Sequence, residues 1–114
     1  MHLKSHSTAD GSIAILELTG RFDAYTAPPV VKWLHAAAAS ASAQVVANLA
    51  GVGFMDSTAL ATLVQGMKRC RQRKGDLRLC CLQKPVSLIF ELTRLDKAFE
   101  IYPDLETALA SMEK

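Results

Sequence analysis

The chain contains 114 residues, of which 50% are hydrophobic and 21% are charged, and its formal net charge is +2. This length is sufficient for one compact domain with its own core, and we expect a single domain over residues 1–114. The charge is too small to favour nucleic acid as a direct partner. The three cysteines are Cys70, Cys80 and Cys81. Their odd number and the lack of a Cys-x-x-Cys spacing indicate reduced thiols, which argues against a disulfide framework or a metal site.

One long segment without charged residues requires an interpretation. Residues Trp33–Met55 contain no Asp, Glu, Lys or Arg, and the segment is long enough to cross a bilayer. It consists mostly of Ala and other small residues, however, and it includes His35, Gln44 and Asn48. We interpret it as the end of an Ala-rich helix, a turn, a buried strand and a second turn. Because the N-terminal residues lack the apolar core of a signal peptide, we expect a cytoplasmic protein without membrane insertion.

The N-terminal part of the chain predicts a β-hairpin. Apolar residues alternate over Ser12–Leu18, which is typical of a strand. The pair Asp10 and Gly11 is a strong turn signal in front of it, so a short strand is expected within residues 2–8. We expect Gly20 to end the second strand and residues 21–25 to form a loop.

Four helices are predicted along the rest of the chain. The first is expected to be capped by Thr26, to begin with two prolines and to bury an apolar stripe: Val30, Val31, Leu34 and Ala38. The second is predicted over residues 57–74 with Gly75 as its C-cap. Its basic run, Lys68 to Lys74, is interpreted as solvated cations that complement the helix dipole. The last two helices are expected to start at Pro85, with Leu92 among the apolar positions, and at Pro103.

Strands are predicted between these helices, at Gln44–Leu49, Leu77–Leu82 and Ala98–Tyr102. The order predicts an α/β fold: a mixed, mostly parallel sheet of four to five strands, preceded by an N-terminal β-hairpin and packed with about four helices. In such sheets, functional groups lie on loops past the carboxyl ends of the strands. Residues 20–26 and 51–58 are expected to occupy two such loops.

The second of these loops contains the most informative stretch, Asp56-Ser57-Thr58, directly before a predicted helix. On one interpretation Ser57 is the N-cap of that helix and Thr58 fills its first turn. On the other, Ser57 accepts a phosphate, because a helix N-terminus exposes unpaired N–H groups and partial positive charge. The local pattern leaves both interpretations open. Asp23, in the first loop, is interpreted as a loop or capping acid.

The sequence contains no catalytic constellation. None of the three histidines belongs to a motif that ties it to Ser57, and a serine without an assigned base is a poor candidate for a hydrolase nucleophile. Gly51-x-Gly53 is only a fragment of a phosphate-binding loop. The histidines and cysteines also lack the spacing of zinc ligands. We therefore predict no enzymatic activity, no cofactor and no metal.

Two stretches together resemble the signatures of the STAS domain family. Leu18–Ala27, with the sequence LTGRFDAYTA, resembles the first signature, and Phe54–Leu60, with the sequence FMDSTAL, resembles the second. Their separation, the chain length and the element order also match. The chain departs from the family at Ala59, where glycine is usual. Alanine is the better helix former, but its methyl group is expected to affect how closely a partner approaches.

The resemblance implies an anti-sigma factor antagonist. Such domains bind an anti-sigma factor of the histidine-kinase-like ATPase type and thereby free a sigma factor. The partner phosphorylates the serine after the motif aspartate, which is Ser57 here with Thr58 as second choice, and a PP2C-type phosphatase reverses the modification. The expected partner surface comprises Arg21, Asp23, Tyr25, Met55, Asp56, Ser57, Thr58 and Ala59.

Two other functions remain open from the sequence. One is a structural or regulatory STAS subunit of a membrane ABC complex of the lipid-transport type, without phosphorylation. The other is a domain that binds a small ligand or nucleotide, although no phosphate loop supports it. We expect the chain to be a monomer or a weak dimer.

Overall fold

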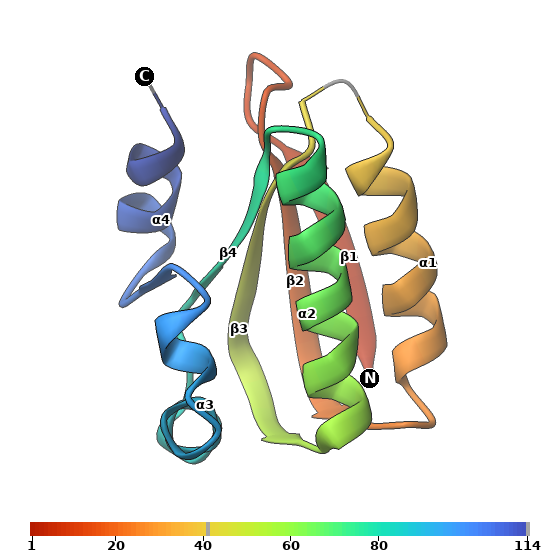
Figure 1. Cartoon of the computed structure of the whole chain (residues 1–114), viewed down its shortest axis with the longest axis vertical. Coiled ribbons are helices and arrows are strands. Elements are labelled where there is room, and N and C mark those ends of the chain that lie inside the picture. The colour runs from red at the N-terminus through yellow and green to blue at the C-terminus, as the bar shows by residue number, and fades with distance from the viewer. Residues whose placement is uncertain (41, 114) are drawn as a thin grey trace.

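The computed structural model describes residues 1–40 and 42–113. Five strands form one sheet in the order β1-β2-β3-β4-β5, in which β1 is antiparallel to β2 and the other neighbours are parallel (Figure 1). This sheet and its four α-helices confirm the predicted α/β fold. In chain order the elements are β1 (His2–Ser7), β2 (Ala14–Phe22), α1 (Ala27–Ala38), β3 (Gln44–Met55), α2 (Ser57–Gln72), β4 (Asp76–Cys80), α3 (Lys84–Leu92), the 3-10 helix η1 (Leu95–Lys97), β5 (Ile101–Tyr102) and α4 (Leu105–Met112).

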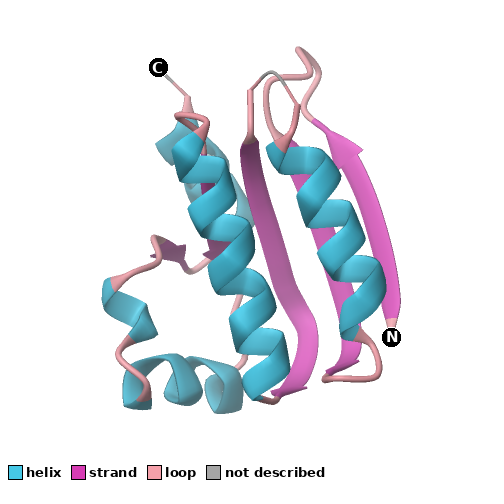
Figure 2. Ribbon diagram, turned by 45° about the vertical axis from the view of Figure 1, so that its right-hand side comes forward, coloured by secondary structure: helices cyan, strands magenta, loops and turns pink. Residues whose placement is uncertain are grey.

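Helices cover both faces of the sheet. α1 and α2 lie side by side on one face and run in the same direction (Figures 1 and 2). Their buried side chains form the main core with the central strands, and α3 contributes Val86 and Phe90 to it. α4 packs on the opposite face, where Ala108 and Met112 form a second cluster with Val46. Because alternate strand residues point to opposite faces, the central strand β3 is buried on both sides.

The predicted N-terminal hairpin is confirmed. β1 pairs with β2 from His2 opposite Thr19 to Ser7 opposite Ala14. Gly11 has a φ of +74°, a left-handed conformation that glycine adopts without a steric penalty. In the turn, the Asp10 carboxylate accepts hydrogen bonds from the Ser12 amide at 3.0 Å and from the hydroxyls of Thr8 and Ser12 at 2.8 Å each. The turn thus has its own polar cluster.

The two strands that lead to the candidate loops are longer than predicted. β2 continues past Gly20 to Phe22, and β3 continues past Leu49 to Met55, so residues 51–55 form a strand and the prediction of a loop there was wrong. The pairing shifts register between Glu17 and Arg21, which marks a bulge. Gly20 takes a φ of +101° within it, and a Cβ on Gly51 would overlap the side chain of Thr19. These glycines therefore serve close strand pairing.

Several other boundaries differ from the prediction. α2 ends at Gln72 with Arg73 as its C-cap, and a Cβ on Gly75 would overlap the carbonyl oxygen of Ala43. Gly75 is therefore required for close packing and does not serve as the C-cap. Leu92, predicted as a core position of α3, is 76% exposed. β4 ends at Cys80, and η1 takes part of the segment before β5, which is only Ile101–Tyr102.

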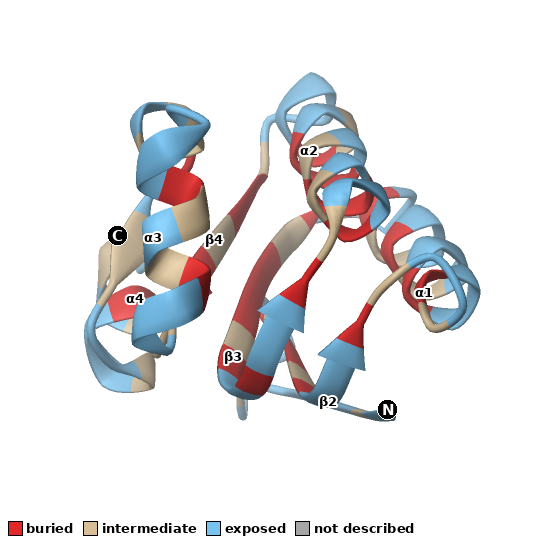
Figure 3. Ribbon diagram, turned by 90° about the horizontal axis from the view of Figure 1, so that it is seen from below, coloured by how far each residue is buried: buried red, intermediate tan, exposed pale blue. Residues whose placement is uncertain are grey.

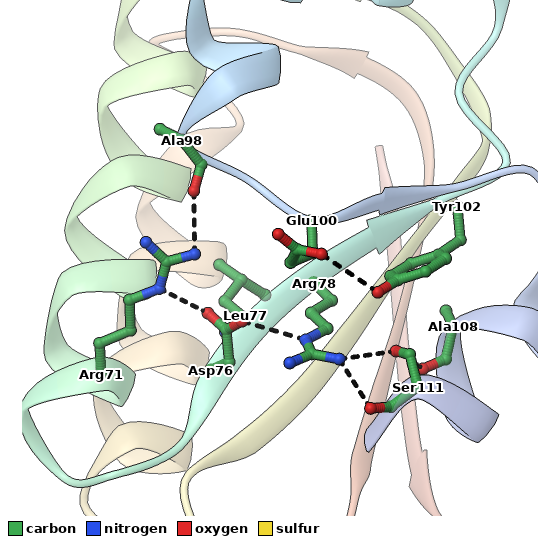
Figure 4. A network of polar contacts seen from close by, with 9 residues as sticks. All are labelled: Arg71, Asp76, Leu77, Arg78, Ala98, Glu100, Tyr102, Ala108 and Ser111. Carbon is green, nitrogen blue, oxygen red and sulfur yellow. Dashed lines mark hydrogen bonds and ion pairs between the residues drawn. The ribbon is translucent and has the colours of Figure 1, made fainter. Parts of the chain in front are cut away.

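A polar network fixes the start of β4 (Figure 4). Asp76 is only 8% exposed, and its carboxylate oxygens pair with Arg71 at 2.8 Å and with Arg78 at 3.0 Å. Arg71 also donates to the Ala98 carbonyl at 2.9 Å. Arg78 donates to the carbonyl and hydroxyl oxygens of Ser111, each at 2.8 Å. The interpretation of the basic run as solvated was thus wrong for Arg71, because it connects α2 to β4 and to the segment before β5.

The uncharged segment forms the end of α1 and the strand β3, as predicted, but the second turn predicted at its end is wrong because β3 continues to Met55. Among the helices of residues 1–40 and 42–113, none has both the length and the apolar composition needed to cross a membrane.

Candidate functional site

The two candidate loops meet at the edge of the sheet where β2 and β3 end, which Figure 3 views from below. β2 leads through residues 23–26 into α1, and β3 leads through Asp56 into α2. The strand ends are paired, with Arg21 opposite Phe54 and Phe22 opposite Met55. The structure therefore brings the two family signatures side by side, as their place after parallel strands predicts.

Asp56 joins the two loops. Its Oδ1 accepts a hydrogen bond from the Ala59 amide at 2.9 Å, which caps α2. Its Oδ2 accepts a hydrogen bond from the Ala24 amide at 3.0 Å, in the other loop. The Asp56 amide also donates to the Phe22 carbonyl at 3.3 Å. One carboxylate thus sets both the start of α2 and the position of the neighbouring loop.

The structure rejects the interpretation of Ser57 as the N-cap. Asp56 occupies that position with an extended backbone, and Ser57 is the first residue of α2. The Ser57 side chain is exposed. Within the described residues, its hydroxyl has no hydrogen-bond partner, nor have the amides of Ser57 and Thr58. The start of α2 therefore presents two amide donors and a free hydroxyl to solvent.

The loop before α1 is held by Asp23. Its Oδ1 accepts hydrogen bonds from the amides of Tyr25 at 3.0 Å and Thr26 at 3.1 Å. Partial desolvation raises the pKa of the Asp23 carboxyl, but the hydrogen bonds from Thr26 and Tyr25 together outweigh it, so the pKa lies below its ordinary value. Thr26 makes no side-chain cap for α1, contrary to the prediction, and its hydroxyl instead donates to the Arg21 carbonyl at 2.9 Å.

Some of the predicted partner-binding residues lie on the surface, and others are buried. Tyr25 is 94% exposed, and Arg21, Ser57 and Thr58 are also exposed. Met55 and Ala59 are buried at 3% and 0% exposure. The Ala59 methyl group therefore lies in the core. The presence of alanine in place of the family's usual glycine affects the packing of α2 on the core and leaves the outer surface unaltered.

Phe54 lies at the surface, although it was not among the predicted partner-binding residues. The Arg21 guanidinium lies 3.9 Å from the centre of its ring, and Phe54 is 38% exposed. Phe22 and Met55, next to this pair in the chain, point into the core, so Arg21 and Phe54 lie on the opposite face of the sheet. The sequence did not indicate this pair, because Gly20 and Gly51 have the appearance of turn glycines although β2 and β3 continue past them.

In the part of the chain that the structure describes, no group of three or more His, Cys, Asp or Glu side chains is arranged to hold a metal ion.

A family model described as STAS domain matches residues 6–108. The chain belongs to the STAS domain family.

Relatives within the STAS family include an anti-sigma-B factor antagonist of Listeria monocytogenes, which is 36% identical over 84 residues, covering 74% of each chain. Among solved structures, an anti-sigma factor antagonist of Mycobacterium paratuberculosis superimposes with a TM-score of 0.85 at 23% identity, over 99% of this chain and 96% of the other. The Bacillus cell fate determinant SpoIIAA in its phosphorylated form gives a TM-score of 0.77 at 14% identity, over 98% of this STAS domain and 100% of that chain. These structural similarities extend over the whole fold.

Proposed function

We propose that this STAS domain is an anti-sigma factor antagonist whose binding to its partner is controlled by phosphorylation of Ser57. The relatives with this name support the first part of the proposal. The observation that supports the second part is the division of roles at the start of α2: Asp56 makes the cap, and the Ser57 hydroxyl is exposed and unused by the fold. A kinase can therefore modify this hydroxyl without breaking a hydrogen bond that stabilises the domain.

The local electrostatics allow a phosphate on Ser57. The helix N-terminus has partial positive charge, and the amides of Ser57 and Thr58 are available as donors. A related fold, that of SpoIIAA, has been solved in a phosphorylated form. The modification is thus expected to leave the fold intact and to act on whatever binds the surface formed by Tyr25, Ser57 and Thr58.

The effect on a partner follows from charge and desolvation. A phosphate adds about −1.5 to −2 charges at neutral pH, beside the carboxylate of Asp56. Burying this dianion in an interface without a matching cation costs several kcal/mol. A hundredfold loss of affinity needs only about 3 kcal/mol. We therefore expect phosphorylation of Ser57 to release the partner.

The partner class is an anti-sigma factor of the histidine-kinase-like ATPase type, and a PP2C-type phosphatase restores the binding form. In this scheme the domain acts in the cytoplasm, is itself no enzyme and binds no nucleic acid directly. The unmodified domain sequesters the anti-sigma factor, which frees a sigma factor.

The test is phosphorylation with purified components. The chain is incubated with ATP and, in turn, with each ATPase of this type encoded in its own genome, and Ser57 and Thr58 are mapped by mass spectrometry. We expect one phosphate on Ser57, none in Ser57→Ala and an unchanged yield in Thr58→Val. Phosphorylated chain is expected to bind that ATPase at least about a hundredfold more weakly. A chain that no ATPase binds or modifies would contradict the proposal and favour the role in an ABC complex.

A further inference from the structure

A groove runs between α1 and α2 on the outer side of the helix layer. It has a volume of about 680 Å³, and its walls are mostly apolar, with Ala27, Val31 and Ala36 from α1 and Thr58 and Thr62 from α2. Val31 is 42% exposed although it is a large aliphatic residue. The groove is therefore an apolar surface in contact with solvent, beside the start of α2.

The charged side chains that line the groove are both cations. These are Lys32 and Arg69, and none of the lining residues is an acid. Neither α1 nor α2 contains a single Asp or Glu, while the last turns of α2 add the exposed Lys68. The 11 acidic residues of the chain all lie outside these two helices. An occupant that places carboxylates beside apolar side chains matches both properties of this surface.

We propose that the groove binds an acidic amphipathic segment of the partner, with apolar side chains against Val31 and carboxylates toward Lys32 and Arg69. The proposal rests on the antagonist function proposed above and names the part of the domain that would recognise the partner. The helix-in-groove mode, with apolar anchors on one face of the bound helix, fits a groove between two helices.

The groove also connects to the phosphorylation site. Thr58, next to Ser57, lines the same groove as Arg69. Arg69 is eleven positions after Thr58 in α2, which corresponds to about 16 Å along the helix. A phosphate on Ser57 therefore places negative charge at one end of the groove, where it repels the carboxylates of the proposed acidic segment. Since screening acts over about 8 Å at physiological salt, repulsion is expected to be strongest near Thr58 and weak near Arg69.

The test measures the affinity of the ATPase that modifies Ser57 for variants of the full chain. Lys32→Glu and Arg69→Glu reverse charges in the groove, and Val31→Ser removes its exposed apolar side chain. Lys97→Glu makes the same charge change on η1, outside the groove, and serves as the matched control. We expect each groove variant to weaken binding by about tenfold or more and Lys97→Glu to change it less than about twofold. Thermal unfolding verifies that each variant is folded. If Lys32→Glu is unfolded, Lys32→Gln is used in its place.

A second probe does not depend on the antagonist function. Two helical peptides of about 12 residues are compared, with leucines on one face and either glutamates or lysines on the other. The glutamate peptide is expected to shift the amide resonances of α1 and α2 residues that line the groove, and the lysine peptide is expected to shift none. Vesicles of phosphatidylcholine with and without phosphatidylglycerol test an anionic membrane as the alternative occupant.

The possible results separate the two proposals. If an ATPase phosphorylates Ser57 and is released, but binds the groove variants as it binds Lys97→Glu, the groove proposal is overturned and the antagonist function stands. If no ATPase binds, the antagonist function fails, and the peptides then decide the groove alone. Equal shifts with both peptides, or binding to phosphatidylglycerol vesicles in place of the glutamate peptide, overturn the acidic segment as the occupant.

Discussion

The carboxylate of Asp56 accepts a hydrogen bond from the Ala24 amide at 3.0 Å, although the two residues are 32 positions apart in the chain. The same side chain caps α2 through the Ala59 amide. Asp56 therefore links the loop that contains Tyr25 to the start of α2, directly before Ser57. This arrangement makes the two signatures one surface.

Replacing Asp56 by alanine is expected to destabilise the domain by about 2 kcal/mol. Loss of an N-cap costs about 1 kcal/mol, and loss of the hydrogen bond to the Ala24 amide costs about 1 kcal/mol more. The matched control is Asp104→Ala, because Asp104 caps α4 through the Thr107 amide at 2.8 Å and is the cap of that helix alone. We expect about 1 kcal/mol for the control by urea unfolding. Equal losses in the two variants would show that the Ala24 contact adds no stability.

Ser57 substitutions are expected to leave stability almost unchanged. Ser57→Ala removes an exposed hydroxyl that makes no hydrogen bond within the described residues, so its effect should stay within about 0.5 kcal/mol. Ser57→Glu places a negative charge in the first turn of α2, where the helix dipole favours it by about 0.3–1 kcal/mol. Urea unfolding of both variants measures this. A loss above about 1 kcal/mol in Ser57→Ala would mean that the hydroxyl is needed for the fold after all.

The sequence predicted the element order and the meeting of the two signatures, because alternating apolar patterns and turn residues are local signals. It misplaced the ends of β2 and β3, since Gly20 and Gly51 have the appearance of turn glycines and their role in strand pairing depends on the partner strand. It also considered Ser57, and not Asp56, as the candidate for the cap of α2. Both residue types are good caps, and only the backbone conformation before α2 distinguishes them.

The Asp76 network could not be predicted from the sequence, for a different reason. Arg71 and Arg78 lie on either side of Asp76 in the chain, but a cation in a basic run is usually solvated. Asp76 is buried at the start of β4, and Ala98 and Ser111 supply further acceptors to the two arginines. Both features depend on how the later elements pack. Contacts between distant segments left no local pattern from which to predict them.

Asp76→Ala is expected to destabilise the domain by about 2 kcal/mol, because it removes a mostly buried acceptor and leaves two guanidinium groups without their carboxylate. The estimate is at the low end for an ion pair, since the Arg71 side chain is 42% exposed and solvent screens its charge. Arg78, at 23% exposure, is expected to matter more than Arg71. A double-mutant cycle with Arg71→Ala and Arg78→Ala, measured by urea unfolding, separates the two pairs. A larger coupling for Arg71 would contradict this order.

The Asp10 carboxyl in the hairpin turn is expected to titrate at an unusually low pH. The Ser12 amide, followed by the hydroxyls of Thr8 and Ser12, lowers the pKa of the Asp10 carboxyl to about 2. The unfolded chain has the higher ordinary value of 3.8, so the folded state favours the carboxylate. The resulting stability is present above about pH 4 and is lost as the pH falls to about 2. Carboxyl NMR titration measures this pKa, and we expect Ser12→Ala to raise it. An unchanged value in Ser12→Ala would mean that the turn conformation alone sets it.

Of the three free thiols, Cys81 is expected to react first. Cys70 and Cys80 are fully buried, while Cys81 is partly exposed. Burial raises the pKa of the Cys70 thiol to about 11, with a further contribution from the charge of Asp76, and burial also raises the pKa of the Cys80 thiol. Because the thiolate is the reactive form, alkylation of the folded chain near pH 8 should label Cys81 alone, as peptide mass mapping would show. In urea all three should react. Prompt labelling of Cys70 in the folded chain would mean that α2 opens readily from β4, and Asp76→Ala should accelerate that opening.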